Sequence, residues 1–169
     1  MLSPTLSHLL WRPTGVLALA ASMCLASYAH AAPVAFNGNY SQNFDTLATS
    51  GTSNAWLQGS TLEGWYLYTG ASADISTYQA GNGSTNAGAF YSFGATGSPE
   101  RALGGTASGG AYFGSPLTGA PAGYIALAAV NSTGTAVDSL SINFNGEQWR
   151  NGGNASAQSM LMQYGIRAC

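Results

Sequence analysis

The stretch Leu140-Ser-Ile-Asn-Phe144 alternates apolar and polar side chains with a strict period of two. This alternation is typical of a β-strand with one face in a hydrophobic core and the other in solvent. A second stretch, Tyr124-Ile-Ala-Leu-Ala-Ala-Val130, is a longer apolar run, and the segment Asn131-Ser-Thr-Gly134 follows it. Its length and its flanking turn residues predict a strand that is buried on both faces.

Shorter strands are expected outward from these two stretches. The candidates are rich in aromatic or apolar residues and lie at residues 65–68, 90–93, 112–113 and 158–164. Segments rich in Gly, Asn and Ser separate them, at residues 81–88, 104–110, 114–123 and 151–154. No helical periodicity persists. The pattern predicts an all-β fold, specifically an antiparallel β-sandwich or jelly roll. Its expected core is Phe44, Leu62, Trp65, Phe90, Phe93, Ile125, Leu127, Leu140, Ile142 and Phe144.

The first 31 residues have the parts of a secretory signal peptide. Arg12 precedes the apolar run Gly15-Val-Leu-Ala-Leu-Ala-Ala-Ser-Met-Cys-Leu-Ala26, and Ala29-His30-Ala31 matches a signal peptidase site. The apolar run is shorter than the roughly 20 residues that a transmembrane helix needs. We therefore expect cleavage after Ala31, a single domain at residues 32–169 and no stable membrane span after cleavage. The expected location is periplasmic, cell-surface or extracellular.

The composition of residues 32–169 removes several classes of chemistry. The chain has no lysine, and both histidines, His8 and His30, lie in the predicted signal peptide. Ser-His-Asp and Cys-His catalysis, Schiff-base chemistry and zinc sites of His and Cys ligands are therefore excluded. Nucleic acid is not an expected partner, because binding it needs clustered Lys and Arg and this region has three scattered arginines.

Carboxylates are the acid–base groups that remain. A glycosidase needs two of them, roughly 5–10 Å apart, and Glu63 and Glu147 are the natural pair because each precedes a tryptophan by two residues. An apolar neighbour can raise the pKa of one carboxyl for acid catalysis. The favoured interpretation is instead structural, with Glu147 and Arg150 forming an ion pair and Trp149 packed in the core.

The segment Glu147–Gly153 also has the residues of a sugar-binding platform. In that interpretation Trp149 stacks on a pyranose face, and Arg150, Asn151 and Asn154 bind hydroxyl groups beside Glu147. This hypothesis makes a polysaccharide the candidate partner. A buried tryptophan of a β-sandwich remains the alternative.

We expect no cofactor, and a structural Ca²⁺ is the alternative. Asp45, Asp74 and Asp138 are the candidate oxygen donors, since Ca²⁺ takes 6–8 oxygen ligands. No Asp-x-Asp-x-Asp-Gly spacing is present.

Four segments resemble a known family. They are Gln42-Asn-Phe-Asp-Thr-Leu47; Ser60-Thr-Leu-Glu-Gly-Trp-Tyr66; Gly81-Asn-Gly-Ser-Thr-Asn-Ala-Gly88 with Phe90-Tyr-Ser-Phe-Gly94 and Arg101-Ala-Leu-Gly104; and Phe144-Asn-Gly-Glu-Gln-Trp-Arg-Asn-Gly-Gly153. Together they resemble the N-terminal β-sandwich region of secreted bacterial PEP-CTERM-type (exosortase-sorted) surface proteins. Similar regions precede exported endonuclease/exonuclease/phosphatase and lamin-tail modules. The resemblance implies export, a surface or matrix location and no assigned reaction.

Family members continue through further strands to a Pro-Glu-Pro motif, an apolar helix and a basic tail, whereas this sequence ends at Gly165-Ile-Arg-Ala-Cys169. We therefore expect a product truncated before the sorting signal and a sandwich that is incomplete at its C-terminus. The predicted strand 158–164 would then be an edge without charge or proline, which favours self-association, with Cys169 available for a disulfide between chains.

These features favour an exported, non-catalytic cell-surface or exopolysaccharide-matrix protein with weak carbohydrate binding. The alternative is an exported carboxylate-dependent hydrolase, or the accessory domain of a secreted glycosidase or nuclease.

Overall fold

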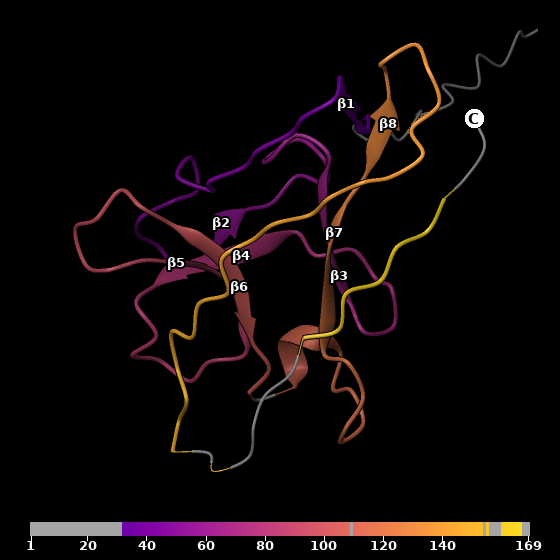
Figure 1. Ribbon diagram of the computed structural model, residues 1–169. Helices are drawn as coiled ribbons and strands as arrows, with labels where there is room; N and C mark the ends of the chain where they lie inside the picture. The colour runs from indigo at the N-terminus through magenta and orange to yellow at the C-terminus, as the bar shows by residue number, and fades with distance from the viewer. Residues whose placement is uncertain (1–31, 109, 154, 156–159, 167–169) are drawn as a thin grey trace, which may run out of the picture.

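The computed structural model describes residues 32–108, 110–153, 155 and 160–166 (Figure 1). Within these residues the chain is all-β, with eight strands and one short 3₁₀-helix. The predicted signal peptide, residues 1–31, lies outside the described part. No helix among the described residues is long and apolar enough to cross a membrane.

The strands form three small sheets. A four-stranded sheet has the order β2-β4-β5-β6, and two-stranded sheets are formed by β3 with β7 and by β1 with β8. The strand bounds are β1 Val34–Phe36, β2 Asn54–Ala55, β3 Trp65–Thr69, β4 Thr77–Gly81, β5 Ala89–Phe93, β6 Ala102–Thr106, β7 Gly123–Leu127 and β8 Ala129–Asn131.

The predicted antiparallel pairing is wrong at two places. β1 pairs with β8 in parallel, and so does β4 with β5, whose register joins Gln79 to Tyr91 and Gly81 to Phe93. The chain returns from the end of β4 to the start of β5 through residues 82–88 alone. Parallel neighbours usually need a connection of a dozen residues or more. This crossover is therefore unusually short and depends on contacts that hold it in place.

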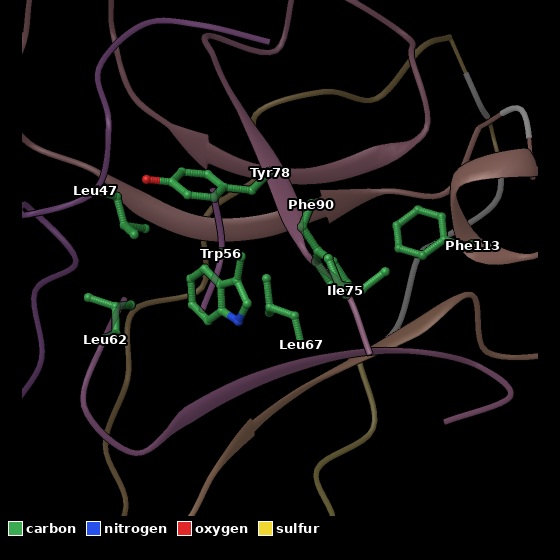
Figure 2. Close-up of a cluster of buried hydrophobic side chains, with 8 residues drawn as sticks. All are labelled: Leu47, Trp56, Leu62, Leu67, Ile75, Tyr78, Phe90 and Phe113. Atoms are coloured by element: carbon green, nitrogen blue, oxygen red, sulfur yellow. The ribbon is translucent and has the colours of Figure 1, made fainter. Parts of the chain in front are cut away.

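Strand β5 is the centre of the fold. All five of its residues are buried, because β4 and β6 pair with its two edges and both of its faces are covered. Successive strand side chains point to opposite faces, so Phe90 belongs to one hydrophobic cluster and Tyr91 and Phe93 to another. Figure 2 shows the first cluster, which contains Leu47, Trp56, Leu62, Leu67, Ile75, Tyr78, Phe90 and Phe113.

The N-terminal part of the predicted core is confirmed. Leu62, Phe90 and Phe93 are buried, and Phe44 and Trp65 are half-buried against the first cluster. The Phe44 and Trp65 rings meet edge to face, with their centroids 5.0 Å apart.

The C-terminal part of the predicted core is wrong. Ile125, Leu127, Leu140, Ile142 and Phe144 are all exposed, by 37% to 65%. Residues 140–144 form no strand, because no described strand pairs with them, and the chain crosses the molecule there as an extended trace (Figure 1). An alternating pattern buries its apolar face only when a neighbouring strand and a second layer are present.

The apolar run 124–130 is not one strand buried on both faces. It divides at Ala128 between β7 and β8. The Ala128 N–H donates to the Gly64 carbonyl (2.8 Å), and the Ala128 carbonyl accepts from the Val34 N–H (2.9 Å). The chain thus changes partner from β3 to β1, and side chains of both short strands stay at least partly open to solvent.

Three further predictions of local structure need correction. Tyr112 and Phe113 lie in the 3₁₀-helix η1 (Ala111–Phe113), which ends at Gly114 in the left-handed backbone conformation. Gly104 and Gly105 lie in β6, where their missing side chains leave room for the rings of Phe93 and Phe90, instead of in a turn. Of the predicted strand 158–164, residues 158–159 lie outside the described part, and 160–164 are exposed and form no strand.

Candidate functional site

Three aromatic rings stack on the second face of β5. The rings of Tyr91 and Phe93 are nearly parallel with centroids 4.8 Å apart, and Trp149 stacks on Phe93 at 6.1 Å with an angle of 6° between the rings. Tyr91 and Phe93 are buried, and Trp149 is half-buried at the outer end of the array. The Trp149 indole Nε1–H donates to Oε2 of Glu147 (2.8 Å), so two contacts determine the orientation of this ring.

Arg150 attaches the same segment to the crossover between β4 and β5. Its Nη1 donates to the carbonyl oxygens of Gly83 (3.1 Å) and Ser84 (3.2 Å). Gly83 has a φ of +80°, and a Cβ at this position would overlap the Trp149 carbonyl. The crossover and the segment around Trp149 therefore fit together only with glycine at position 83.

The predicted ion pair between Glu147 and Arg150 is replaced by these contacts, since Glu147 accepts from the indole and Arg150 donates to backbone carbonyls. The structure thus brings together Glu147, Trp149 and Arg150 of the predicted sugar platform. Asn151 follows them and is exposed. Asn154 lies outside the described residues.

Three tyrosines have raised pKa values; Tyr91 is buried, and Tyr68 and Tyr112 are half-buried. The Tyr91 hydroxyl donates to the Ala87 carbonyl of the crossover (2.8 Å), and burial raises the pKa of Tyr91. Burial likewise raises the pKa of Tyr112, whose hydroxyl donates to the Thr77 carbonyl. The pKa of Tyr68 is raised first by burial and then by the charge of Asp74. The Tyr91 and Tyr112 hydroxyls therefore remain protonated donors at neutral pH.

The structure does not assemble the predicted Ca²⁺ site. Asp45 accepts from the Arg101 backbone N–H (3.0 Å), and Asp74 accepts from the Gln58 side chain (3.3 Å). Asp138 is exposed in the segment that follows β8. Among the residues that the structure describes, no three His, Cys, Asp or Glu side chains are grouped closely enough to hold a metal ion.

The two carboxylates of the hydrolase alternative lie in separate surroundings. Glu63 is exposed in the turn before β3, and Glu147 is exposed beside the crossover. Within the described part of the chain, no hydrogen bond joins them.

Sequence reasoning missed a polar pocket at the ends of β4 and β5. It has a volume of about 240 Å³ and is lined by Thr49, Gly81, Asn82, Gly94, Ala95, Thr96, Gly97 and Arg101. Arg101 is 3% exposed. The one available signal was its position in a segment that carries the family resemblance, because its spacing to the other lining residues follows no motif.

No protein-family model matches the chain, and no curated protein and no solved structure matches it. The resemblance to PEP-CTERM-type proteins therefore stays a prediction from the four segments.

Proposed function

We propose that the protein is an exported, non-catalytic component of a bacterial cell surface or exopolysaccharide matrix that binds glycans weakly. The observation that carries this proposal is the fixed, half-exposed ring of Trp149, which is stacked on Phe93 and hydrogen-bonded to Glu147. A large ring that is held before the ligand arrives loses little conformational freedom on binding. Its apolar face suits the C–H face of a sugar ring.

Polar groups for sugar hydroxyls adjoin the ring. Arg150 uses Nη1 for the two backbone carbonyls, so its Nε and Nη2 groups remain available as donors. The Asn151 amide is exposed beside them and offers a donor and an acceptor. These groups form few directional contacts, which supports weak binding.

The resemblance supports the setting of this proposal. We propose that the strands belong to a β-sandwich of the PEP-CTERM-associated kind and that the protein is exported by its predicted signal peptide. The low charge, with four arginines, no lysine and six Asp and Glu residues in the whole chain, suits a polysaccharide environment.

A glycan array tests the proposal with three variants. Trp149→Ala should weaken binding about tenfold, while Trp149→Phe keeps a ring against Phe93 and should retain part of the affinity. Glu147→Gln keeps an acceptor for the indole N–H and should bind as the original chain does. Equal binding by Trp149→Ala and the original chain contradicts the platform. Polysaccharide turnover that Glu147→Gln abolishes would establish the hydrolase instead.

A further inference from the structure

Arg101 is buried, and among the described residues its guanidinium donates hydrogen bonds only to neutral groups. Its Nε donates to the Ser92 hydroxyl (2.8 Å), and its Nη2 donates to the carbonyl oxygens of Ser92 and Gly81. The carboxylate of Asp45 accepts from the Arg101 backbone N–H and from Asn43, so it does not bond the guanidinium. A buried charge is costly unless an opposite charge compensates it.

One nitrogen of this guanidinium, Nη1, has no hydrogen-bond acceptor among the described residues. Nη1 makes none of the hydrogen bonds of Arg101, although no buried side-chain nitrogen or oxygen of the described residues lacks a partner. Nη1 is therefore not fully enclosed, and Arg101 is one of the residues that line the polar pocket at the ends of β4 and β5. Gly94 allows the guanidinium to approach this end of β5, because a Cβ there would overlap both Nη1 and the Glu100 carbonyl.

We propose that this pocket binds one small oxyanion group, a carboxylate or a sulfate, with Arg101 Nη1 as its charged donor. Thr49 and Thr96 line the same pocket, and each carries a hydroxyl that can act as a neutral donor. The volume of about 240 Å³ is below the roughly 300–1,000 Å³ of pockets for drug-sized ligands, which suits a single anionic group. Two carboxylates lie close to Arg101: Asp45 accepts from its backbone N–H, and the exposed Glu100 precedes it in the chain. Their negative charges oppose the binding of an anion and make it weak.

This site is separate from Trp149 and does not depend on the sugar platform. Tyr91 and Phe93, which carry the Trp149 stack, alternate along β5 with Ser92, which binds Arg101. The two sites therefore use opposite faces of the strand. An acidic polysaccharide is one source of the oxyanion, and free sulfate is another.

Backbone NMR titration of the purified chain tests the proposal with inorganic sulfate, galacturonate and galactose, against sodium chloride at matched ionic strength. Galacturonate should shift the amide signals of Gly94, Thr96 and Gly97, whereas galactose and chloride should not. A matching response to sulfate identifies a general oxyanion site, and its absence restricts the site to sugar carboxylates. Equal responses to galactose and galacturonate, or no response to either anion, overturn the proposal.

Two substitutions of Thr49 test the location of the site without removing a contact of Arg101. Thr49 is exposed, and its side chain makes no hydrogen bond with the described residues. Thr49→Glu places a negative charge in the pocket and should weaken anion binding at least about tenfold. Thr49→Gln introduces a side chain of the same size as Glu but without the charge, and it should change the affinity for the anion less than threefold. Equal affinity of the two variants overturns the assignment, while affinity for glycans at Trp149 should be the same in both.

Discussion

Two regions of the chain use their apolar residues in opposite ways. In residues 34–113, apolar side chains form two clusters around β5, and all the buried residues of the described part belong to this region. In residues 114–166, no described residue is buried. Except for Leu57, the exposed large hydrophobic residues all belong to this second region.

Whether an apolar side chain is buried therefore depends more on strand partners than on the apolar pattern of the sequence. Strand β5 has a neighbour on each edge and a cluster on each face, so even Ser92 is fully buried. Residues 140–144 have a more regular alternation of apolar and polar side chains than β5, but no described strand pairs with them. The second region is attached to the first through the pairing of β7 and β8 with β3 and β1, and through Trp149 and Arg150.

The sharpest test makes the same substitution in both regions. Leu67 is 0% exposed and Leu140 is 63% exposed. Leu67→Ala should lower the free energy of unfolding by about 2–5 kcal/mol, because it opens a cavity in the first cluster. Leu140→Ala should change it by less than about 0.5 kcal/mol. Urea unfolding measures both, and equal losses would show that residues 140–144 are packed in solution.

A pair of glycines tests the attachment of the second region. Gly83 and Gly119 have φ values of +80° and +83°, but only Gly83 has a close neighbour, the Trp149 carbonyl. Alanine at either position costs about 1–2 kcal/mol of backbone strain. Gly83→Ala should cost about 1–3 kcal/mol more, because Trp149 must move away.

Near-UV circular dichroism reports the consequence, since the stacked indole of Trp149 contributes to the aromatic signal. The signal should fall in Gly83→Ala and stay unchanged in Gly119→Ala. Identical spectra and stabilities of the two variants would mean that the segment 147–150 does not rest on the crossover.

The sequence predicted the aromatic strands of the first region and missed what surrounds them. Residues 65–68 and 90–93 lie in strands as expected, because aromatic side chains favour β-strands. Strand β6 escaped prediction because Gly104 and Gly105 indicate a turn. Only the rings of Phe93 and Phe90 lying over them explain glycine in a strand, and that is a long-range contact.

The candidate site was predictable in its residues and not in its contacts. The sequence predicted Glu147, Trp149 and Arg150 as site residues. It could not show that Arg150 binds the carbonyls of Gly83 and Ser84, which lie 67 and 66 positions earlier in the chain. The Arg101 pocket was invisible for the same reason, since its lining comes from several separate segments. Spacing within one segment carries no information about such juxtapositions.

A smaller effect is expected at alkaline pH, and it comes from the first region. Burial raises the pKa of Tyr112 above its ordinary value of 10.0. The folded chain therefore holds this proton more tightly than the unfolded chain, so stability is complete below pH 10 and falls as the pH rises toward the folded-state pKa. Tyr112→Phe should lose about 1 kcal/mol at pH 7 with the bond to Thr77, and its stability should fall less steeply above pH 10.

Urea unfolding at several pH values between 7 and 11 measures this difference. Tyr68 and Tyr91, whose pKa values are also raised, contribute to the remaining slope in both proteins. Parallel curves of stability against pH for Tyr112→Phe and the original chain would show that the pKa of Tyr112 is the same in the folded and the unfolded chain.

The smallest effect on folding is expected for the exposed apolar side chains of residues 140–144. Combined replacement of Leu140, Ile142 and Phe144 by serine should leave the free energy of unfolding almost unchanged, since these side chains are 56% to 65% exposed. Its effect should fall on association, because uncovered apolar segments pair with other chains. Size-exclusion chromatography over a range of concentrations should show less oligomer than for the original chain.

A matched variant with serine at Met160, Leu161 and Met162 separates this segment from the predicted edge at 158–164. If the second variant alone reduces association, that edge is the interface; if the first does, the interface includes residues 140–144. A monomer at all concentrations would exclude both. A large loss of stability in either variant would contradict the distinction between the two regions, because it would show that the second region belongs to the same cooperative core as β5.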